Sequence, residues 1–307
     1  MSIPEAARFE RKLGTTQFLI TMEVNPPKGT DLAEIVQAVE RARTLVDAVN
    51  VTDGSGAIMR ACSLAVAKAV LDAGVDPVLQ MTCRDRNRLA LQADLLGAAI
   101  LDIRNLLLLT GDDPKTGDHP DAKPVFDITS AALMQVAKGL MDGKDMAGKE
   151  LKGAPRFCIG AACDPSAKGL DVEIQKFQAK IGGGAQFFQT QAVFDAPSFS
   201  RFAARIKPFG KPVLAGILLV KSAKMARYMN EHVWGIHVPD DLIARFEQAA
   251  DKRAECVAVT AALIKAVREA GADGIHLYPL GWEDLVPAIL KDAGVIGQAK
   301  RHTTAIA

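Results

Sequence analysis

Three features are scarce in this sequence of 307 residues: aromatic side chains, net charge and long apolar runs. Aromatic residues make up 5% of the chain, which is too few for a surface that stacks nucleic-acid bases. The 37 basic and 36 acidic side chains leave a charge of +1, without the basic excess typical of proteins that bind nucleic acid. The longest apolar stretch, near residues 95–101, is far shorter than the ~18 residues that span a bilayer. We therefore expect neither a nucleic-acid partner nor a membrane span.

The first 14 residues mix both charge signs and lack the apolar core of a secretory signal. We therefore expect a cytoplasmic protein.

Cysteine and histidine are also few, and neither follows the spacing of a metal site. No C-x-x-C or H-x-x-x-H pattern joins the five cysteines (62, 83, 158, 163, 256) or the five histidines (119, 232, 237, 276, 302). The sequence predicts buried free thiols, no disulfide framework and no metal site.

Short apolar runs alternate with longer segments of helical period through the whole chain. Strands are predicted over residues 18–24, 48–52, 77–82, 103–110, 156–161, 187–190, 212–218 and 274–277. Helices are predicted from a capping-box-like start at 31–34, over 61–73 and 88–99, from about 129, and around Phe199, Phe202, Ala203 and Ile206.

About eight βα units without a linker favour one (β/α)8 barrel. We predict a single domain over 1–307, with an N-terminal extension at 1–14 and a C-terminal tail at 296–307. The competing doubly wound sheet has five or six strands and a phosphate loop after the first strand. Here Pro26 and Pro27 follow that strand, and proline offers no N–H group to a phosphate.

Three glycine clusters resemble phosphate loops only in part. Residues 143–150 nearly match G-x-x-x-x-G-K-[ST], but Glu150 replaces the hydroxyl residue and the segment precedes a strand, so we expect an exposed connection. Residues 182–184 also precede a strand and are predicted to end a helix. Gly54 and Gly56 follow a strand and fit either a phosphate contact or a turn.

Polar residues where strands end are the candidate site, because barrel enzymes work at that face. Glu23 fits a general acid, since partial burial favours a protonated carboxyl, or a rim glutamate in a salt bridge. Asp112 fits a ligand acceptor or a turn residue. The amide of Gln191 both donates and accepts, which suits a pterin edge. Asp195 is predicted to cap the next helix.

A polar wall is predicted from residues that alternate along the second and third strands: Asn50, Thr52, Gln80 and Thr82. It either binds a ligand or is a polar layer of the barrel. The set contains no Ser–His–Asp group, metal cluster or Schiff-base lysine. This favours a flat heteroaromatic molecule whose own chemistry performs the reaction.

The ordered motifs resemble those of the flavin-dependent 5,10-methylenetetrahydrofolate reductases. They are EVNPP (23–27), VNVT (49–52), QMTC (80–83), LTGD (109–112), FQTQ (188–191), FD (194–195), LAGIL (214–218) and HLY (276–278), and the resemblance spans about residues 15–295. It implies FAD across the strand ends and hydride transfer that yields 5-methyltetrahydrofolate. It assigns Glu23 as the general acid and Asp112 as the aspartate beside the flavin. Gln191 and Tyr278 would bind folate, and the flavin contacts would be Thr52, Gln80, Thr110, Gly111, Asp112 and Lys180.

The resemblance also has departures that bear on the cofactor and on partners. Gln80 replaces a frequent histidine, Thr110 and Ala179 replace arginines, and Trp282 replaces the arginine that meets the folate tail. FMN is therefore the alternative to FAD. Residues 83–88 and 118–124 are similar to the short forms of one-carbon pathways, which implies an oligomer and NAD(P)H or a zinc or iron–sulfur partner subunit as electron source. The rival functions are a non-redox pterin-binding methyltransferase and a flavin subunit that is inactive without its partner.

Overall fold

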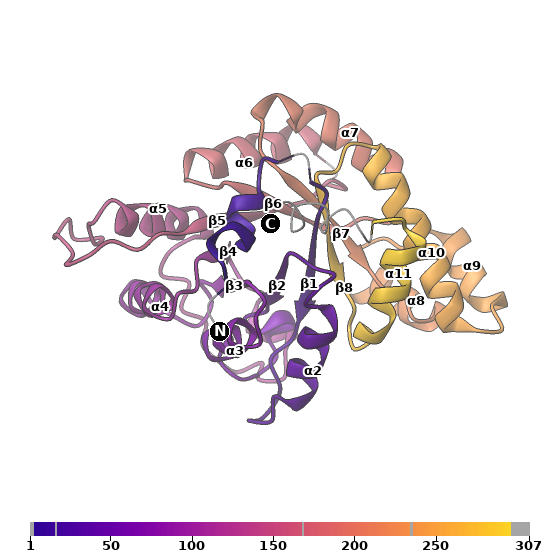
Figure 1. Cartoon of the computed structure of the whole chain (residues 1–307), viewed down its shortest axis with the longest axis horizontal. Helices are drawn as coiled ribbons and strands as arrows, with labels where there is room; N and C mark the ends of the chain where they lie inside the picture. The colour runs from indigo at the N-terminus through magenta and orange to yellow at the C-terminus, as the bar shows by residue number, and fades with distance from the viewer. Residues whose placement is uncertain (1–2, 16, 168, 234–235, 296–307) are drawn as a thin grey trace, which may run out of the picture.

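Eight parallel strands close into a barrel in the computed structural model, which describes residues 3–15, 17–167, 169–233 and 236–295. The order β1 to β8 around the barrel follows the chain (Figure 1). The strands are β1 (Leu19–Val24), β2 (Ala48–Val51), β3 (Pro77–Thr82), β4 (Asn105–Leu109), β5 (Cys158–Cys163), β6 (Phe187–Ala192), β7 (Val213–Leu218) and β8 (Gly274–Tyr278). The prediction of a single (β/α)8 barrel is confirmed.

Helices follow the strands and form the outer layer. They are α1 (Phe9–Lys12), α2 (Ala33–Ala42), α3 (Ser63–Asp72), α4 (Arg88–Ile100), α5 (Ser130–Met141), α6 (Leu170–Gly182), α7 (Ala196–Ile206), α8 (Ala223–His232), α9 (Asp240–Gln248), α10 (Lys252–Glu269) and α11 (Val286–Asp292). Short 3₁₀ turns lie at η1 (Glu5–Ala7), η2 (Ser55–Ala57), η3 (Pro114–Thr116), η4 (Lys207–Phe209) and η5 (Glu283–Leu285). Helices α8, α9 and α10 all follow β7 and precede β8 in the sequence. They lie together at the right of the barrel in Figure 1.

Helix ends largely follow the local signals of the sequence. Asp195 caps α7 by accepting from the amide of Ser198, as predicted. Residues 182–184 end α6, and residues 143–150 form an exposed connection between α5 and β5. The predicted start at 31–34 is slightly early: α2 begins at Ala33, whose amide donates to Asp31.

Three strand predictions differ from the structure by two residues, the first being β4, which begins at Asn105 and not at 103. β5 covers Cys158–Cys163 and not 156–161, because its small residues carry no β-branched signal and Pro165 stops the pairing only later. β6 runs to Ala192, two residues beyond the prediction. Gln191 therefore lies within a strand.

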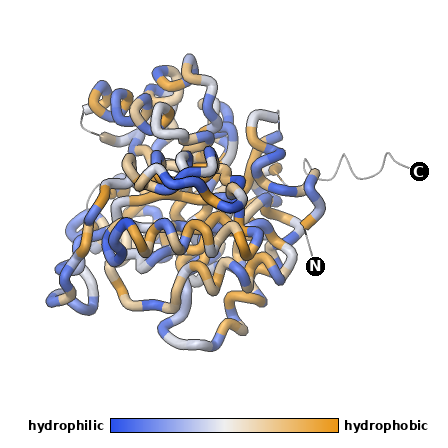
Figure 2. Tube along the Cα trace, turned by 90° about the vertical axis from the view of Figure 1, so that its left-hand side faces the viewer, coloured by the Kyte–Doolittle hydropathy of each residue, from blue (hydrophilic) through white to orange (hydrophobic). Residues whose placement is uncertain are grey.

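The outer helices are amphipathic, and Figure 2 shows hydrophobic and hydrophilic segments alternating along them. In α7 the predicted stripe is buried at Phe199, Phe202 and Ile206. Among the described residues, no helix combines the length and apolar character needed to cross a bilayer. The predicted tail at 296–307 lies outside those residues.

The N-terminal segment closes the amino end of the barrel (Figure 1). Phe9 is fully buried in an inner cluster whose strand members are Leu19, Ala48, Val78, Leu107, Cys158, Phe187 and Leu214. Its ring meets Phe187 edge to face at 5.2 Å. Beside it the buried guanidinium of Arg8 pairs with Asp76 at 2.9 Å and with Asp102. The barrel thus has an apolar floor supplied by residues that precede the first strand.

Replacing Phe9 with alanine is expected to lower the free energy of unfolding by about 3–5 kcal/mol, because it removes a fully buried ring and leaves a cavity among its neighbours. Urea unfolding measures the change. Ile100→Ala is the control, since Ile100 is 83% exposed and its loss is expected to cost under about 0.5 kcal/mol. Equal losses in the two variants would contradict the role of Phe9 as the floor.

A second prediction concerns the thiols, because four of the five cysteines are buried and only Cys62 is exposed. Burial raises the pKa of Cys83 to about 11 and also raises the pKa of Cys158, Cys163 and Cys256. Since the thiolate is the reactive form, native protein is expected to react quickly with a thiol reagent at one position. Titration with the reagent is expected to detect one fast-reacting thiol in the native protein and five after unfolding. The native Cys62→Ser variant is expected to show no fast-reacting thiol. A second fast thiol in the native protein would refute this.

Candidate functional site

Glu23 is a nearly buried carboxyl at the carboxyl end of β1, with 8% of its surface exposed. The amide nitrogen of Gln80 on β3 donates to its Oε2 at 3.2 Å. The Nε2 atom of His276 on β8 lies 3.7 Å from the same oxygen. Glu23 therefore lies inside the barrel mouth, between an amide and an imidazole and without a lysine or arginine partner among the described residues.

Below Glu23, polar side chains from four strands meet across the barrel interior. Thr21 Oγ1 lies 2.9 Å from His276 Nδ1 and accepts from the amide of Gln189 at 3.1 Å. Gln189 and Asn50 exchange two hydrogen bonds of 2.7 and 3.1 Å. All four side chains are buried, so each satisfies the hydrogen-bonding capacity of the next.

The predicted polar wall is thus a bonded interior layer in its lower part. Asn50 and Gln80 lie inside the barrel, as the alternation predicted. The hydroxyl groups higher in the wall contact neighbouring loops: Thr52 donates to Asn25 at 3.0 Å, and Thr82 donates to Asp53 at 2.9 Å. Thr52 is buried and presents no free hydroxyl hydrogen to a ligand.

Tyr278 at the end of β8 spans toward β6. Its hydroxyl donates to the carbonyl of Thr190 at 3.1 Å, and its ring meets His276 edge to face at 4.5 Å. Burial, with a smaller effect from the Glu23 carboxylate, raises the pKa of Tyr278, so the hydroxyl stays protonated. Gly216 on β7 makes room chiefly for the backbone of β6 and also for this ring, because a Cβ there would lie 2.4 Å from the carbonyl oxygen of Thr190 and 3.0 Å from Tyr278.

Gln191 is exposed at a register irregularity between β6 and β7. Two neighbouring hydrogen bonds hold this irregularity: the Gly216 amide donates to Thr190 Oγ1, and that hydroxyl donates to the carbonyl of Gln191. Such irregularities re-aim side chains beside active sites. The Gln191 amide is left open to solvent at the same end of the barrel as Glu23.

Asp112 lies in the loop after β4 and is exposed. Its Oδ2 accepts from the backbone amide of Gly56 at 2.8 Å. Gly54 precedes the 3₁₀ turn η2 (Ser55–Ala57), and both Gly54 and Gly56 have positive φ, so the segment forms a turn; a phosphate contact there stays a prediction. Asp112 therefore links the β4 loop to the β2 loop, and its second oxygen accepts no hydrogen bond from a described residue.

The other residues assigned to the flavin, Gly111, Thr110 and Lys180, differ in how far their side chains are already engaged. Gly111 has φ +95°, and a Cβ there would lie 3.0 Å from the Cβ atoms of Thr82 and Arg84, so only glycine fits. Thr110 is exposed and donates to Ser130. Lys180 extends from α6 to the carbonyl of Ala162 at 2.7 Å, so its ammonium group is already bonded to β5.

Sequence reasoning missed the interior roles of Thr21, Gln189 and His276. The available signal was a polar residue at every second position of otherwise apolar strands. It also missed Asp53, which accepts from the amide and hydroxyl of Thr82 and pairs with Arg86. Asp53 fastens the end of β2 to the end of β3.

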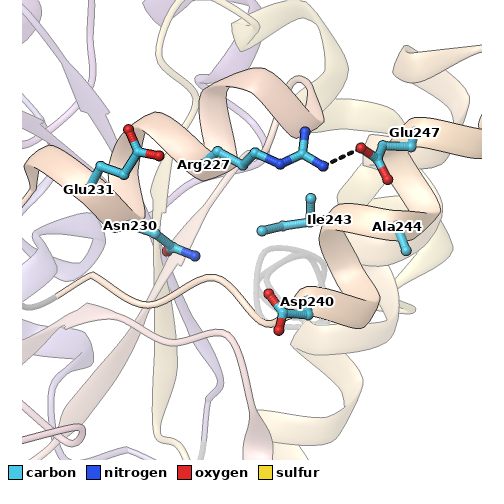
Figure 3. Close-up of a pocket in the computed structure, with 7 residues that line it drawn as sticks. All are labelled: Arg227, Asn230, Glu231, Asp240, Ile243, Ala244 and Glu247. Atoms are coloured by element: carbon cyan, nitrogen blue, oxygen red, sulfur yellow. Dashed lines mark hydrogen bonds and ion pairs between the residues drawn. The ribbon is translucent and has the colours of Figure 1, made fainter.

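Two cavities bear on the position of the site, one among the loops at the carboxyl end of the barrel and one between two outer helices. One of about 300 Å³ lies between the connections that follow β5 and β6, and its polar lining includes Ser166, Asp195, Ser198, Arg201 and His237. The other, of about 430 Å³, lies between α8 and α9 on the outside of the barrel (Figure 3). An ion pair between Arg227 and Glu247 crosses it, and it contains none of the predicted site residues.

The described part of the chain contains no cluster of three or more His, Cys, Asp or Glu side chains that could hold a metal ion. His302 lies outside that part.

Comparison with known proteins connects this geometry to a family. The sequence model described as "Methylenetetrahydrofolate reductase" matches residues 8–294. A Caenorhabditis elegans relative, "Probable methylenetetrahydrofolate reductase (NADPH)", is 24% identical over 94% of this chain and 44% of its own length. The Salmonella typhimurium "5,10-methylenetetrahydrofolate reductase" is 25% identical over 91% of this chain and 92% of its own length. The chain thus spans less than half of the nematode relative.

A solved Clostridium thermocellum protein, described as binding two copies of 5-methyl-5,6,7,8-tetrahydrofolic acid, has the same fold. It aligns with a TM-score of 0.58 and 14% identity over 91% of this chain and 95% of that one. The match of the family model over residues 8–294, on a closed eight-stranded barrel, places the chain in the methylenetetrahydrofolate reductase family.

Proposed function

We propose that this chain reduces 5,10-methylenetetrahydrofolate to 5-methyltetrahydrofolate with a bound flavin. The observation that carries the proposal is Glu23, a nearly buried carboxyl at the barrel mouth with the amide of Gln80 and the imidazole of His276 beside it. Membership of the family and the 92% coverage of the Salmonella relative support the same reaction.

The role of Glu23 follows from the substrate's chemistry. Opening the five-membered ring of the substrate breaks the bond from N10 to the one-carbon unit, and N10 takes the electron pair. An amine leaves poorly as an anion, so N10 needs a proton as the bond breaks. Glu23 in its protonated form donates it and becomes a carboxylate, which the N–H groups of Gln80 and His276 then stabilise. When bound, reduced flavin supplies the hydride for the one-carbon unit.

The donor set at the mouth fits the polar edge of a flavin ring. Gln80 offers an amide, Thr110 a hydroxyl and Asp112 a carboxylate oxygen, which together complement alternating donors and acceptors. Gly111 is a proposed flavin contact through its backbone, and its missing side chain leaves room for Thr82 and Arg84. Thr52 supports this edge through Asn25.

Lys180 is the proposed contact for the flavin phosphates, and it would have to leave Ala162 to make that contact. FAD is the proposed cofactor, with the single phosphate of FMN as the alternative.

Folate binding is assigned to Gln191 and Tyr278. The exposed amide of Gln191 both donates and accepts, as a pterin edge requires. Tyr278 has its hydroxyl bonded to Thr190, so its ring can serve as a fixed wall beside Glu23.

We further propose a cytoplasmic oligomer that takes electrons from NAD(P)H or from a zinc or iron–sulfur partner subunit.

The experiment is the visible spectrum of the purified chain after incubation with FAD. Bands near 375 and 450 nm (roughly, the ordinary absorbance of a flavin) that bleach with a reductant and return with methylenetetrahydrofolate support the reductase. A protein that stays colourless with FAD and with FMN would instead favour a non-redox pterin-binding methyltransferase. Colour whose return needs an added partner protein would identify a subunit of a larger complex.

Glu23→Gln is expected to leave reduction of the flavin intact but to slow folate reduction by ~10²–10⁴-fold, because the amide cannot supply the proton. Stopped-flow absorbance measures the two half-reactions separately. Glu34→Gln, at an exposed position on α2, is the control and is expected to match the unchanged chain. An unchanged folate half-reaction in Glu23→Gln would remove Glu23 from the mechanism.

Asp112→Asn is expected to raise the midpoint potential of the flavin or to weaken folate binding by roughly tenfold, because one negative charge is lost while an oxygen remains for Gly56. Spectroelectrochemistry and folate titration measure the two effects. Asp113→Asn is a matched control, since the carboxylate of Asp113 accepts from the amide of Lys115 and from no other described residue, and asparagine keeps that oxygen. If the two variants behave alike, Asp112 is a turn residue.

A further inference from the structure

The buried side chains beneath Glu23 form one continuous hydrogen-bonded chain. It runs from Asn50 through Gln189 and Thr21 to His276, with contacts of 2.7–3.1 Å, and ends 3.7 Å from Glu23. These residues come from β2, β6, β1 and β8. All are at most 2% exposed, so water does not compete for their hydrogen bonds.

The pair of amides sets the direction in which hydrogen bonds are donated along this series of side chains. Each of Asn50 and Gln189 donates one N–H to the carbonyl oxygen of the other. The second N–H of Gln189 then points at Thr21 Oγ1, which accepts it. The hydrogen of the Thr21 hydroxyl is therefore free to go to His276 Nδ1, at 2.9 Å, in preference to the carbonyl of Ile275 at 3.4 Å.

A hydroxyl that donates to Nδ1 fixes the tautomer of the imidazole. Nδ1 carries the lone pair, so the ring hydrogen of neutral His276 is on Nε2. Nε2 is the atom that faces Glu23 Oε2. Gln80 donates to that same oxygen, so two N–H groups converge on Oε2. Oε1 accepts no hydrogen bond from any described residue.

We propose that His276 is a positioning residue, which with Gln80 keeps Oε2 unprotonated so that the transferable proton of Glu23 is on Oε1. The inference rests on the proposed function and adds to it the oxygen from which the proton leaves. The distance of 3.7 Å is long for a hydrogen bond, as catalytic contacts often are before substrate binds. After transfer, the same two N–H groups stabilise the carboxylate that remains.

If every hydrogen bond in the series were donated the other way, the proton of Glu23 would be held on Oε2. If both amides were turned over, Thr21 would donate to Gln189, and Nδ1–H of His276 would donate to Thr21. The lone pair of Nε2 would then accept the Glu23 proton from Oε2 and hold it in the interior. The position of one imidazole hydrogen thus distinguishes an acid that is ready to donate from one that is blocked.

The test reads that hydrogen directly. In uniformly ¹⁵N-labelled full-length protein without substrate, long-range ¹H–¹⁵N spectra report which nitrogen of each histidine is protonated, and His276→Gln assigns the signal. We expect Nε2–H in the unchanged chain. Thr21→Val, which keeps the shape but removes the hydroxyl, is expected to mix the tautomers.

The functional arm compares two replacements of His276. His276→Leu removes the donor and is expected to slow the folate half-reaction about 10–100-fold, while the reduction of the flavin stays unchanged. His276→Gln keeps an N–H near the position of Nε2 and is expected to recover most of that loss. His232→Gln, exposed on α8, is the control. The unfolding midpoint of each variant shows whether it is folded.

The outcomes separate the inference from the function that it refines. An Nδ1–H tautomer in a chain that reduces folate overturns the role of His276 alone, as do equal rates in His276→Leu and His276→Gln. A chain with Nε2–H that does not reduce folate overturns the proposed function, and the role of His276 with it. Nε2–H together with rescue by glutamine supports both.

Discussion

The interior of the closed barrel is almost inaccessible to solvent, so its polar side chains depend on one another for hydrogen bonds. That constraint governs the layer formed by Thr21, Asn50, Gln189 and His276. Leaving one of these groups without a partner would cost about 1–3 kcal/mol, so the whole layer must be present for any member to be tolerated. Glu23 lies above this layer, where its Oε2 accepts from Gln80 and lies 3.7 Å from His276 Nε2.

The two ends of the barrel are built from opposite kinds of residue. The interior at the amino end is filled by the apolar contact of Phe9 with Phe187, beside the buried Arg8–Asp76 ion pair, while the carboxyl end carries carboxyl, amide and phenol groups. The floor supplies stability and leaves the rim free to hold side chains whose partners are few. Asp112 and Gln191, both exposed, show how little of the rim is used for packing.

The sequence was sufficient for the architecture, because eight alternating units leave a closed parallel barrel as the simplest arrangement. It was less informative where small residues form a strand: β5, with its run of glycine and alanine, was displaced by two residues. The pairings inside the barrel could not be read from the sequence. Asn50 and Gln189 are far apart in the chain, and only barrel closure brings them together.

The directions in which side chains point were the second feature that the sequence could not predict. Glu23 was singled out by its place at the end of an apolar strand, and its burial agrees with that reasoning. Lys180 was assigned from the resemblance alone, and its ammonium group bonds to Ala162 in a way that no local pattern announces. The irregularity that turns Gln191 outward depends on Thr190 and Gly216, which belong to different strands.

The floor also orders events during synthesis. Phe9 is synthesised well before Phe187 and Leu214, its partners in the floor. At about 5–20 residues per second, Phe9 waits on the order of ten to forty seconds for these partners. The floor cannot form during that interval. Docking of Phe9 therefore follows the synthesis of β6 and β7, although Phe9 precedes both strands in the chain.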